Sequence, residues 1–267
     1  MSINNYRIQI ANAIAPVERV PTRKGTTFKA DIITEERDRR KAFLKLLKVE
    51  DIAKEILCAT LARKLHLPIK QAFYVNVDPF IVEGGLRGNT FNVAFGIERD
   101  YFPSFPLSNN QLENEIVNWS DALRCAVFDE WIFNPDRLPK NLVFVKNGEY
   151  WLFDHDEALP NSAREDECAN SSILQLLSKD KTELELYSIR RSAMNFVDEY
   201  KNIDWSEIYS LMRPEEMQQS NVFYKKYIEF LKSRTLHMHA IITKSLGIRQ
   251  QEMKFSDRDN QNEENNK

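Results

Sequence analysis

The stretch from Leu142 to Phe153 constrains the fold most, because two short apolar runs, LVFV and YWLF, flank the tetrapeptide KNGE. An Asn-Gly pair between two such runs is the strongest short-range signal for a β-hairpin with a two-residue type I′ turn. That turn pairs Lys146 with Glu149. The same register places Asn141 opposite Asp154. Directly opposed side chains lie about 4.5–5.5 Å apart, so the sequence predicts an amide and a carboxylate side by side at the open end of the hairpin.

An amide oxygen and a carboxylate at that spacing suit one Mg²⁺ ion, which takes oxygen ligands and keeps places for water and phosphate. A local role is the alternative, with Asn141 as a turn residue and Asp154 as a cap of the next segment. The residues upstream favour the metal site. Asp136 lies five residues before Asn141, and Asp154 follows thirteen residues after it. Protein kinases have this order, with Asp for the attacking hydroxyl and then Asn and Asp for metal.

Composition excludes several classes of protein. With 267 residues, 42% hydrophobic and 29% charged, the chain has room for one domain of two lobes or for two modest domains. A formal net charge of −3 gives no electrostatic footprint for nucleic acid or an anionic membrane. No window reaches the about 18 apolar residues of a membrane span, and the first residues lack the pattern of a signal peptide. We therefore expect a cytoplasmic protein without membrane or direct nucleic-acid partners. Of the three cysteines, Cys58, Cys125 and Cys168, the first two lie in apolar helical runs and are expected to be buried thiols.

Strand and helix signals divide the chain at about Leu107. The part before it mixes strands and helices and the part after it is mainly helical, so an α+β arrangement with a cleft between the parts is expected. The run 251–267 is polar and nearly free of apolar residues, which predicts a disordered tail. The expected elements are a strand at Phe43–Leu47, a helix at Asp51–Leu65 with Asp51 as N-cap, a strand at Ala72–Val77, a helix at Ser120–Phe133, the hairpin, and helices from Ser171 to Leu246, the last opened by Pro214 and closed by Gly247.

Lys45 stands in the apolar strand FLKLL, a poor place for an ammonium group unless it meets a partner charge or a phosphate. Glu55 is the expected partner, because its neighbours on the same helix face are small or apolar and turn it toward another element. A Lys–Glu pair that positions nucleotide phosphates is the protein-kinase arrangement. Two alternatives remain open. Lys45 extends to the surface while Glu55 is exposed, or Lys48 makes the phosphate contact.

Two blocks of the sequence resemble the HipA-like kinases. NPDRLPKN followed by WLFDHDEAL is similar to their catalytic loop and to the setting of their metal-binding aspartate. KAFLKLLKVEDIAKEILCATLARKLHLPI is similar to their block of a strand with Lys, a helix with Glu and an L-x-x-x-L-x-L-P run. Together the blocks cover roughly Thr22 to Leu159. The resemblance implies a two-lobed protein-kinase-like fold of the α+β class, with a small strand-rich N-lobe at about 1–106 and a larger helical C-lobe at about 107–250.

The resemblance also implies ATP- and Mg²⁺-dependent phosphotransfer and a set of site residues. Asp136 would meet the acceptor hydroxyl, and Lys140 or Arg137 would steady the charge on the transferred phosphoryl group. The stretch PTRKGTTF supplies the one glycine of the expected nucleotide loop. The expected residues are Asp136, Lys45, Glu55 and Lys140 for catalysis, Lys45, Gly25, Thr26 and Thr27 for the nucleotide, and Asn141 and Asp154 for the metal.

A Ser or Thr hydroxyl on a protein is the acceptor that the resemblance implies, and a helix-turn-helix regulator of the antitoxin type is the further partner it suggests. Two other classes of function remain open. One is a kinase for a small molecule or a lipid headgroup on the same scaffold. The other is a non-catalytic nucleotide-binding or interaction protein. The set Asp136, Asn141 and Asp154 argues against the last, because a scaffold has no physical need for a charged metal cradle.

Overall fold

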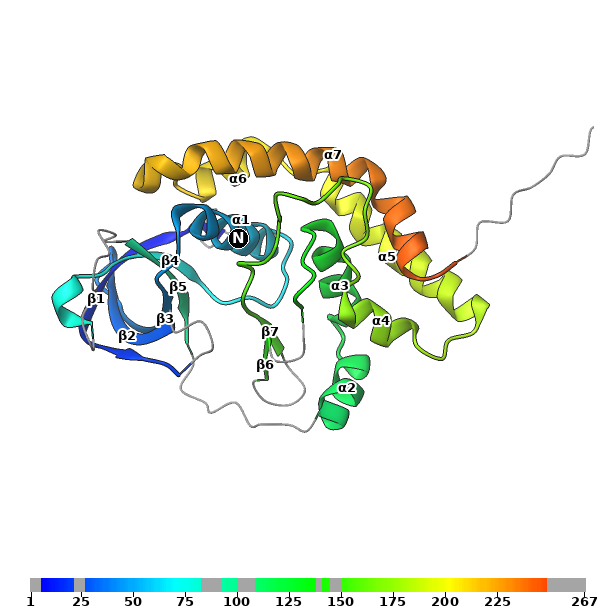
Figure 1. The fold of residues 1–267 in the computed structure, drawn as a ribbon, viewed down its shortest axis with the longest axis horizontal. Helices are drawn as coiled ribbons and strands as arrows, with labels where there is room; N and C mark the ends of the chain where they lie inside the picture. Colours follow the sequence, from blue (N-terminus) through cyan, green and yellow to red (C-terminus); the bar gives the residue numbers. More distant parts are fainter. Residues whose placement is uncertain are drawn as a thin grey trace, which may run out of the picture.

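The computed structural model describes residues 6–21, 27–82, 93–99, 109–137, 141–144 and 150–248. Within these ranges five strands close into a barrel in the order β1, β2, β3, β5, β4. Figure 1 shows the barrel at one end of the molecule, in blue and cyan. All neighbours in it are antiparallel except β1 and β4, which run parallel. The strands are β1 (Gln9–Arg19), β2 (Thr27–Thr34), β3 (Arg39–Lys45), β4 (Ala72–Asn76) and β5 (Val93–Glu98).

Alternation along the strands separates the inner face of the barrel from its outer face. Phe28 and Leu44 belong to the apolar cluster that fills the barrel. Lys45 follows Leu44 and therefore points outward, on the face where Thr27 opposes it on β2 and Phe95 opposes it on β5. The register of the barrel thus presents the Lys45 ammonium group to the elements that pack outside it.

The strand that carries Lys45 and the helix after it begin earlier than predicted. The strand runs from Arg39 to Lys45, and α1 (Val49–Lys64) follows. Lys48 is the N-cap of α1, while Asp51 lies in the first turn, where a negative charge suits the helix N-terminus. The prediction of Asp51 as N-cap is wrong. An Asp in the first turn gives much the same sequence signal as a capping Asp, and this helix has no side-chain cap.

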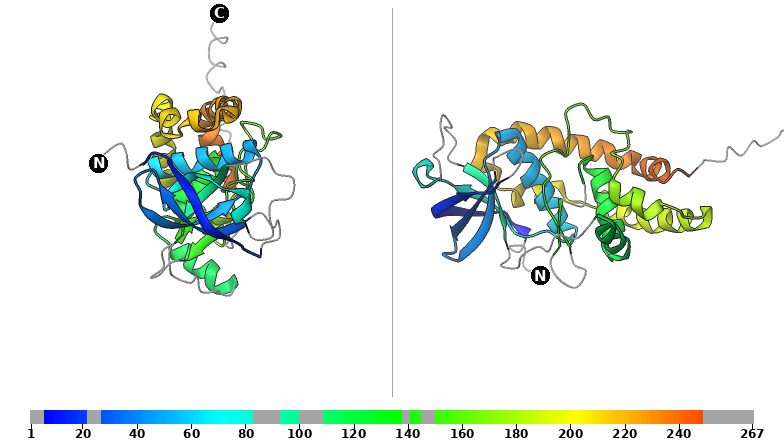
Figure 2. Two further views of the ribbon diagram at one scale, coloured as in Figure 1. Left: turned by 90° about the vertical axis from the view of Figure 1, so that its left-hand side faces the viewer. Right: turned by 60° about the horizontal axis from the view of Figure 1, so that its bottom comes forward.

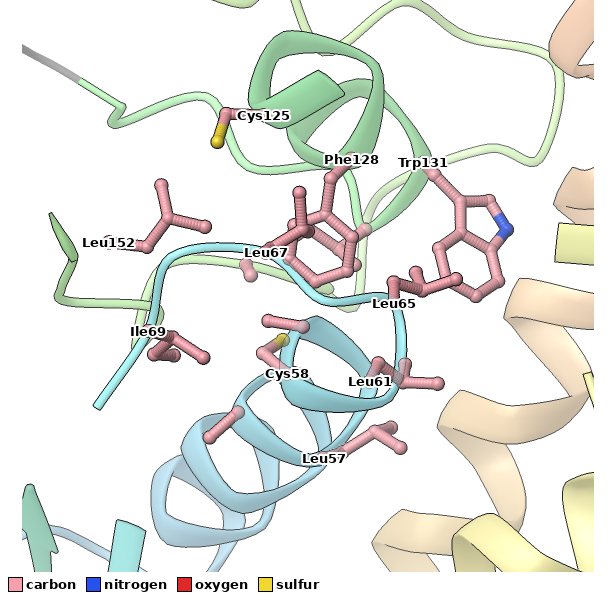
Figure 3. Close-up of a cluster of buried hydrophobic side chains, with 14 of the residues drawn as sticks. Leu57, Cys58, Leu61, Leu65, Leu67, Ile69, Cys125, Phe128, Trp131 and Leu152 are labelled. Atoms are coloured by element: carbon pink, nitrogen blue, oxygen red, sulfur yellow. The ribbon is translucent and has the colours of Figure 1, made fainter. Parts of the chain in front are cut away.

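Helix α1 is buried without a break from Ile52 to Ala62. A helix buried all round needs neighbours on every side, and α1 packs against β4 and β5 and also against helices from the end of the chain. Figure 3 shows the cluster in which Leu57 and Leu61 of α1 lie with Phe128 and Trp131. Helix α1 therefore lies at the centre of the core that joins the barrel to the helices.

After β5 the described part of the chain is helical, apart from a two-stranded sheet of β6 and β7. The predicted α+β class, with a strand-rich N-terminal region and a helical C-terminal part, is confirmed. The last long helix is shorter than predicted, because Pro214 opens a separate 3-10 segment and α7 begins at Asn221. Gly247, with a φ of 66°, follows its end as expected. The remaining elements are η2 (Pro79–Ile81), α2 (Asn109–Asn118), α3 (Ala122–Trp131), β6 (Leu142–Phe144), β7 (Tyr150–Leu152), α4 (Ser172–Ser178), α5 (Glu183–Lys201), α6 (Trp205–Leu211), η4 (Pro214–Ser220) and α7 (Asn221–Ser245).

Helix α7 runs from the barrel side of the molecule to α5, as Figures 1 and 2 both show. Near its start, the hydroxyl oxygens of Tyr224 and of Tyr74 on β4 are 2.6 Å apart in a buried hydrogen bond. Further along, the Thr235 hydroxyl accepts a hydrogen bond of 2.9 Å from Trp131 Nε1 on α3. The last helix therefore contacts both the strand-rich and the helical part.

Cys58 and Cys125 are buried free thiols, as predicted, and Cys168 is a third buried free thiol. Burial raises the pKa of the Cys58 and Cys125 thiols well above its usual range, so both are neutral packing groups. In the ranges that the structure describes, no helix combines the length and the apolar character that crossing a membrane requires.

Candidate functional site

The β6–β7 hairpin carries Asn141 and Asp154 at its open end, but its register differs from the prediction. Phe144 pairs with Tyr150, so Asn141 falls level with Phe153 and not with Asp154. This pairing leaves five residues between the strands, all of them outside the described part of the chain. A two-residue turn leaves an even number of residues between any two paired positions, and five is odd. The register prediction is therefore wrong by one residue.

Asp154 leaves the hairpin because the backbone turns sharply at this residue. Its φ is 65°, in the left-handed region that costs a non-glycine residue about 1–3 kcal/mol. β7 has already ended at Leu152, and the carboxylate reaches the barrel instead of the facing strand. Asp154 Oδ1 lies 2.5 Å from Nζ of Lys45. This contact joins the hairpin to β3.

Lys45 is only 4% exposed and lies between two carboxylates. Its ammonium group forms ion pairs with Glu55 of α1 and with Asp154, and it lies 5.0 Å from the centre of the Phe153 ring. Burial opposes its charged form, but Glu55 and Asp154 outweigh burial and raise the pKa of Lys45 above its ordinary value. An ammonium group has three donors, so one remains for a further acceptor. The alternative in which Lys45 extends to the surface does not describe this structure.

Glu55 connects Lys45 to the segment after the hairpin. Glu55 Oε1 contacts Lys45, while Oε2 accepts a hydrogen bond of 3.1 Å from the backbone N–H of His155. The His155 Nδ1 atom lies 3.6 Å from the same oxygen. Burial favours the protonated acid, yet Lys45 and His155 hold the pKa of Glu55 down at about 2. Glu55 is therefore an anion buried between α1, the barrel and the Asp154 segment.

Asp136 and Asn141 lie together in the loop between α3 and β6. Asn141 Nδ2 donates to the backbone oxygen of Asp136 at 2.5 Å and to its carboxylate Oδ2 at 3.2 Å. The Asp136 backbone N–H in turn donates to Asn134 Oδ1 at 3.3 Å. Asp136 is half-buried, so its carboxylate keeps access to solvent. A half-buried carboxylate of fixed direction is suited to receive a proton from a bound hydroxyl.

Asn141 and Asp154 each offer an oxygen atom of the kind that divalent cations bind. Because the Asn141 nitrogen is used by Asp136, the Asn141 amide oxygen is left without a partner among the described residues. Lys45 outweighs the effect of burial and holds the pKa of Asp154 below its ordinary value, so this carboxylate is ionised. Burial and the Asp154 charge raise the pKa of the neighbouring Asp156 to about 6. Amide and carboxylate oxygens with excess negative charge are the ligands that Mg²⁺ prefers.

Three of the expected site residues, Lys140, Gly25 and Thr26, lie outside the described residues. Thr27 opens β2 and pairs with Lys45, so its side chain is on the same face of the barrel. Lys48, the alternative phosphate contact, precedes α1 as its N-cap and is exposed. The structure thus brings Lys45, Glu55 and Asp154 into contact, and separately Asp136 and Asn141.

Arg137 does not have the role suggested from the sequence. Its side chain is fully buried, and its Nε donates to both carboxylate oxygens of Asp129 on α3, at 3.2 and 3.1 Å. It also donates to the backbone oxygens of Asn141 and Phe153. A guanidinium group held this way faces the interior and cannot steady charge on a transferred phosphoryl group.

Sequence reasoning also missed Glu130, the neighbour of Asp129 on α3. Its carboxylate accepts hydrogen bonds of 2.8 Å from the backbone N–H groups of Ala169 and Ser171. Its backbone oxygen accepts from Arg234 of α7, which also donates to the backbone oxygens of residues 164 and 165. Hydrogen bonds therefore fix the backbone after Asp154 on both sides of Asn170. The only signal in the sequence was a DE pair inside an otherwise apolar helix.

A family model described as HipA-like kinase matches residues 37–229, more than half of the chain. No curated protein matches this chain. One similar solved structure is the Golgi casein kinase, with 12% sequence identity and a TM-score of 0.43, covering 92% of this chain and 76% of that one. Another is the open conformation of CtTel1, with 13% identity and a TM-score of 0.26, covering 83% of this chain and 11% of that one. Both TM-scores are low, so the family match alone is used to interpret the site.

Proposed function

The chain belongs to the family of HipA-like kinases, and from this premise we propose that it is an ATP- and Mg²⁺-dependent kinase that phosphorylates a Ser or Thr hydroxyl of a protein. The observation that carries the proposal is the position of Lys45, whose ammonium group contacts both Glu55 and Asp154. A Lys–Glu pair next to a metal-binding Asp is the set of groups with which protein kinases hold nucleotide phosphates.

In this proposal each side chain has a defined task. The remaining donor of Lys45 binds an oxygen of the α- or β-phosphate, and Glu55 keeps Lys45 in place. Asp136 takes the proton of the acceptor hydroxyl. The oxygen of that hydroxyl forms a bond to the γ-phosphorus while the bond between the γ-phosphorus and the β–γ bridging oxygen breaks, so that ADP leaves. Asn141 fixes the direction of the Asp136 carboxylate through its amide nitrogen. We assign Lys140 to the charge that develops on the transferred group.

Asn141 and Asp154 are the residues that would hold Mg²⁺. When bound, the ion supplies positive charge that neutralises the phosphate oxygens during transfer. The contact between Asp154 and Lys45 places the proposed metal ligand next to the proposed phosphate ligand. Gly25, Thr26 and Thr27 are proposed to cover the phosphates, which agrees with the pairing of Thr27 and Lys45 on one face of the barrel.

We propose further that about 1–106 and 107–250 are the two lobes of a kinase domain, with the nucleotide between them. The predicted tail at 251–267 lies outside the described residues. The protein would act in the cytoplasm, and a helix-turn-helix regulator of the antitoxin type is a partner that the family suggests. These proposals rest on the family match over residues 37–229 and on the change from strands to helices along the chain.

The testing experiment has two arms. Isothermal titration measures ATP binding with and without Mg²⁺, and we expect micromolar affinity that depends on the metal. Transfer of a labelled γ-phosphate is then measured against a protein mixture and against a panel of small metabolites and lipid headgroups. Asp136→Asn is the control for contaminating kinases, because it should remove transfer and leave the protein folded.

Each result decides between the function classes. Label on Ser or Thr of proteins supports the proposal. Label on a small molecule or a lipid headgroup alone replaces the protein acceptor by that class. Mg·ATP binding without transfer to any acceptor favours a non-catalytic nucleotide-binding protein. Absence of Mg·ATP binding overturns the kinase proposal.

A further inference from the structure

A buried ion pair lies directly behind the loop that carries Asp136. The side chains of Asp129 and Arg137 have no exposed surface. Asp129 lies on the buried side of α3, near the C-terminal end of the helix, and Arg137 follows Asp136 in the chain. Because Nε of Arg137 donates to both Asp129 oxygens, the guanidinium plane is fixed relative to the helix.

The other end of Arg137 reaches both sides of the hairpin. Its Nη1 donates to the backbone oxygen of Asn141 at 3.2 Å and to the backbone oxygen of Phe153. Asn141 is one proposed metal ligand, and Phe153 directly precedes Asp154, the other. One guanidinium group therefore connects α3 to the two points from which the proposed ligands depart.

Asp129 also fixes the segment that precedes Asp136. Its Oδ1 accepts a hydrogen bond of 3.1 Å from Asn134 Nδ2, and Asn134 Oδ1 accepts one of 3.3 Å from the backbone N–H of Asp136. The same carboxylate thus orients the segment before Asp136 through Asn134 and the segment after it through Arg137.

The Asp129–Arg137 ion pair is not explained by fold stability alone. Removing two charges from water costs several kcal/mol per ion, and an apolar pair of similar volume is often at least as stable. An apolar pair, however, has no donors for two backbone oxygens. Arg presents a planar, rigid fork of donors, which suits a carboxylate on one side and carbonyl groups on the other. The ion pair therefore serves the site by orienting its backbone, and not by adding stability.

We propose that Asp129 and Arg137 are positioning residues that fix Asp136, Asn141 and Asp154 relative to one another. This inference rests on the proposed function for its kinetic consequence, but the positioning itself can be measured without turnover. Neither residue touches nucleotide or acceptor. They act only through the backbone of the loop and the hairpin.

The test uses Arg137→Lys and Asp129→Asn in the full chain. Lysine keeps the positive charge but not the fork, so it cannot reach Asp129 and both backbone oxygens together. We expect the Mg²⁺ concentration for half-maximal phosphotransfer to rise and kcat to fall, each by about 10–100-fold, the usual effect of losing a residue that orients metal ligands. The KM for ATP should change less than kcat, because Lys45 and Glu55 are untouched.

The matched control is Tyr224→Phe, which removes one partner of the buried Tyr74–Tyr224 hydrogen bond between β4 and α7. It tests whether losing any buried polar contact has the same effect. Its midpoint of chemical unfolding should fall, while its Mg²⁺ dependence should equal that of the parent. An equal shift of Mg²⁺ dependence in Tyr224→Phe and Arg137→Lys contradicts a positioning role.

Amide hydrogen exchange gives the readout that does not need turnover. In Arg137→Lys, peptides that carry Asp136, Asn141 and Phe153 should exchange faster, while peptides of α5 and α7 should keep the parent rate. If the parent chain transfers no phosphate, the proposed function fails, and the exchange pattern still decides the positioning claim. Uniformly faster exchange, or parent-like exchange together with parent-like kinetics, overturns it. Should Arg137→Lys not fold, the isosteric Asp129→Asn provides the same comparison.

Discussion

Lys45 is an ammonium group on the outer face of the barrel, in contact with Glu55 and Asp154. Lys48 lies nearby on the chain, but it is the N-cap of α1 and its backbone oxygen accepts from Ile52. We predict that Lys45→Met weakens Mg·ATP binding by at least about tenfold, because it removes the proposed charged hydrogen bond to a phosphate oxygen, and such a bond is worth about 1.5–3 kcal/mol. Lys48→Met should change it little. Calorimetry of both variants is the measurement, and the reverse order would make Lys48 the phosphate contact.

We predict that Asp136 and Asp154 have separable tasks. Asp136→Asn should keep Mg·ATP binding while phosphotransfer falls by about 10²-fold or more, the usual scale for a positioned base. Asp154→Asn should lose both metal-dependent binding and transfer, because it removes a ligand charge that Lys45 also contacts. Binding and transfer rates of the two variants, with circular dichroism to confirm folding, give the comparison. The assignment is reversed if Asp136→Asn abolishes Mg·ATP binding and Asp154→Asn leaves it intact.

Glu55 makes stability depend on pH. Its pKa is about 2 in the folded protein, against an ordinary value of 4.5. An acid whose folded pKa is lowered stabilises the fold fully above its unfolded value, and this contribution is lost as pH falls toward the folded value. Glu55→Gln should therefore have a lower free energy of unfolding at pH 7 and a flatter dependence between pH 4.5 and about 2. Urea unfolding at several pH values measures this, and parallel curves for parent and variant would contradict it.

At the scale of elements, α1 is attached to the chain after Asp154 and to α7 through Glu50. Glu50 Oε1 accepts hydrogen bonds from Asn161 Nδ2 at 3.0 Å and from the Tyr227 hydroxyl at 2.9 Å. We predict that Tyr227→Phe lowers the free energy of unfolding by about 1 kcal/mol, the usual net value of one hydrogen bond. Chemical unfolding measures it. No loss of stability would show that Glu50 finds an equal partner in water.

The types of the elements could be predicted because they depend on local pattern. The apolar run around Lys45 is a strand, the run that contains Glu55 is a helix, and the expected α3 is present. The register of β6 with β7 could not be predicted from the Asn-Gly pair alone, since the observed pairing is shifted by one residue from the pairing that a two-residue turn sets. The same limit explains Asp129. Its partner Arg137 lies beyond the end of its own helix, so helical periodicity carries no sign of their pairing.

At the scale of the whole molecule, the strand-rich and helical parts are joined by contacts far apart in sequence. The backbone N–H of Ile8 donates a hydrogen bond of 3.0 Å to the backbone oxygen of Leu211 on α6. Arg213 forms an ion pair with Glu35 next to β2, and Tyr224 contacts Tyr74. The helices that cover α1 therefore also hold the barrel. Loss of these helices should affect the site even though none of their residues is proposed to touch a substrate.

We predict that a chain ending at Ser220, without α7, neither unfolds cooperatively nor binds Mg·ATP. The reason is that the buried surface of α1 between Ile52 and Ala62 loses part of its cover. A chain ending at Ile248 is the matched control and should behave as the parent. Calorimetry and urea unfolding of both chains are the measurements. Cooperative unfolding of the shorter chain would show that the barrel and α3 are stable by themselves.

Because α7 lies near the C-terminal end of the described chain and packs on the barrel side, the order of synthesis matters. A ribosome releases the strands and α1 first, with the apolar faces that α7 later covers still open to water. Such surfaces are where a nascent chain aggregates or binds chaperones. The native core closes only when α7 has emerged. Messages cut short before this helix should therefore yield chains that the cell degrades.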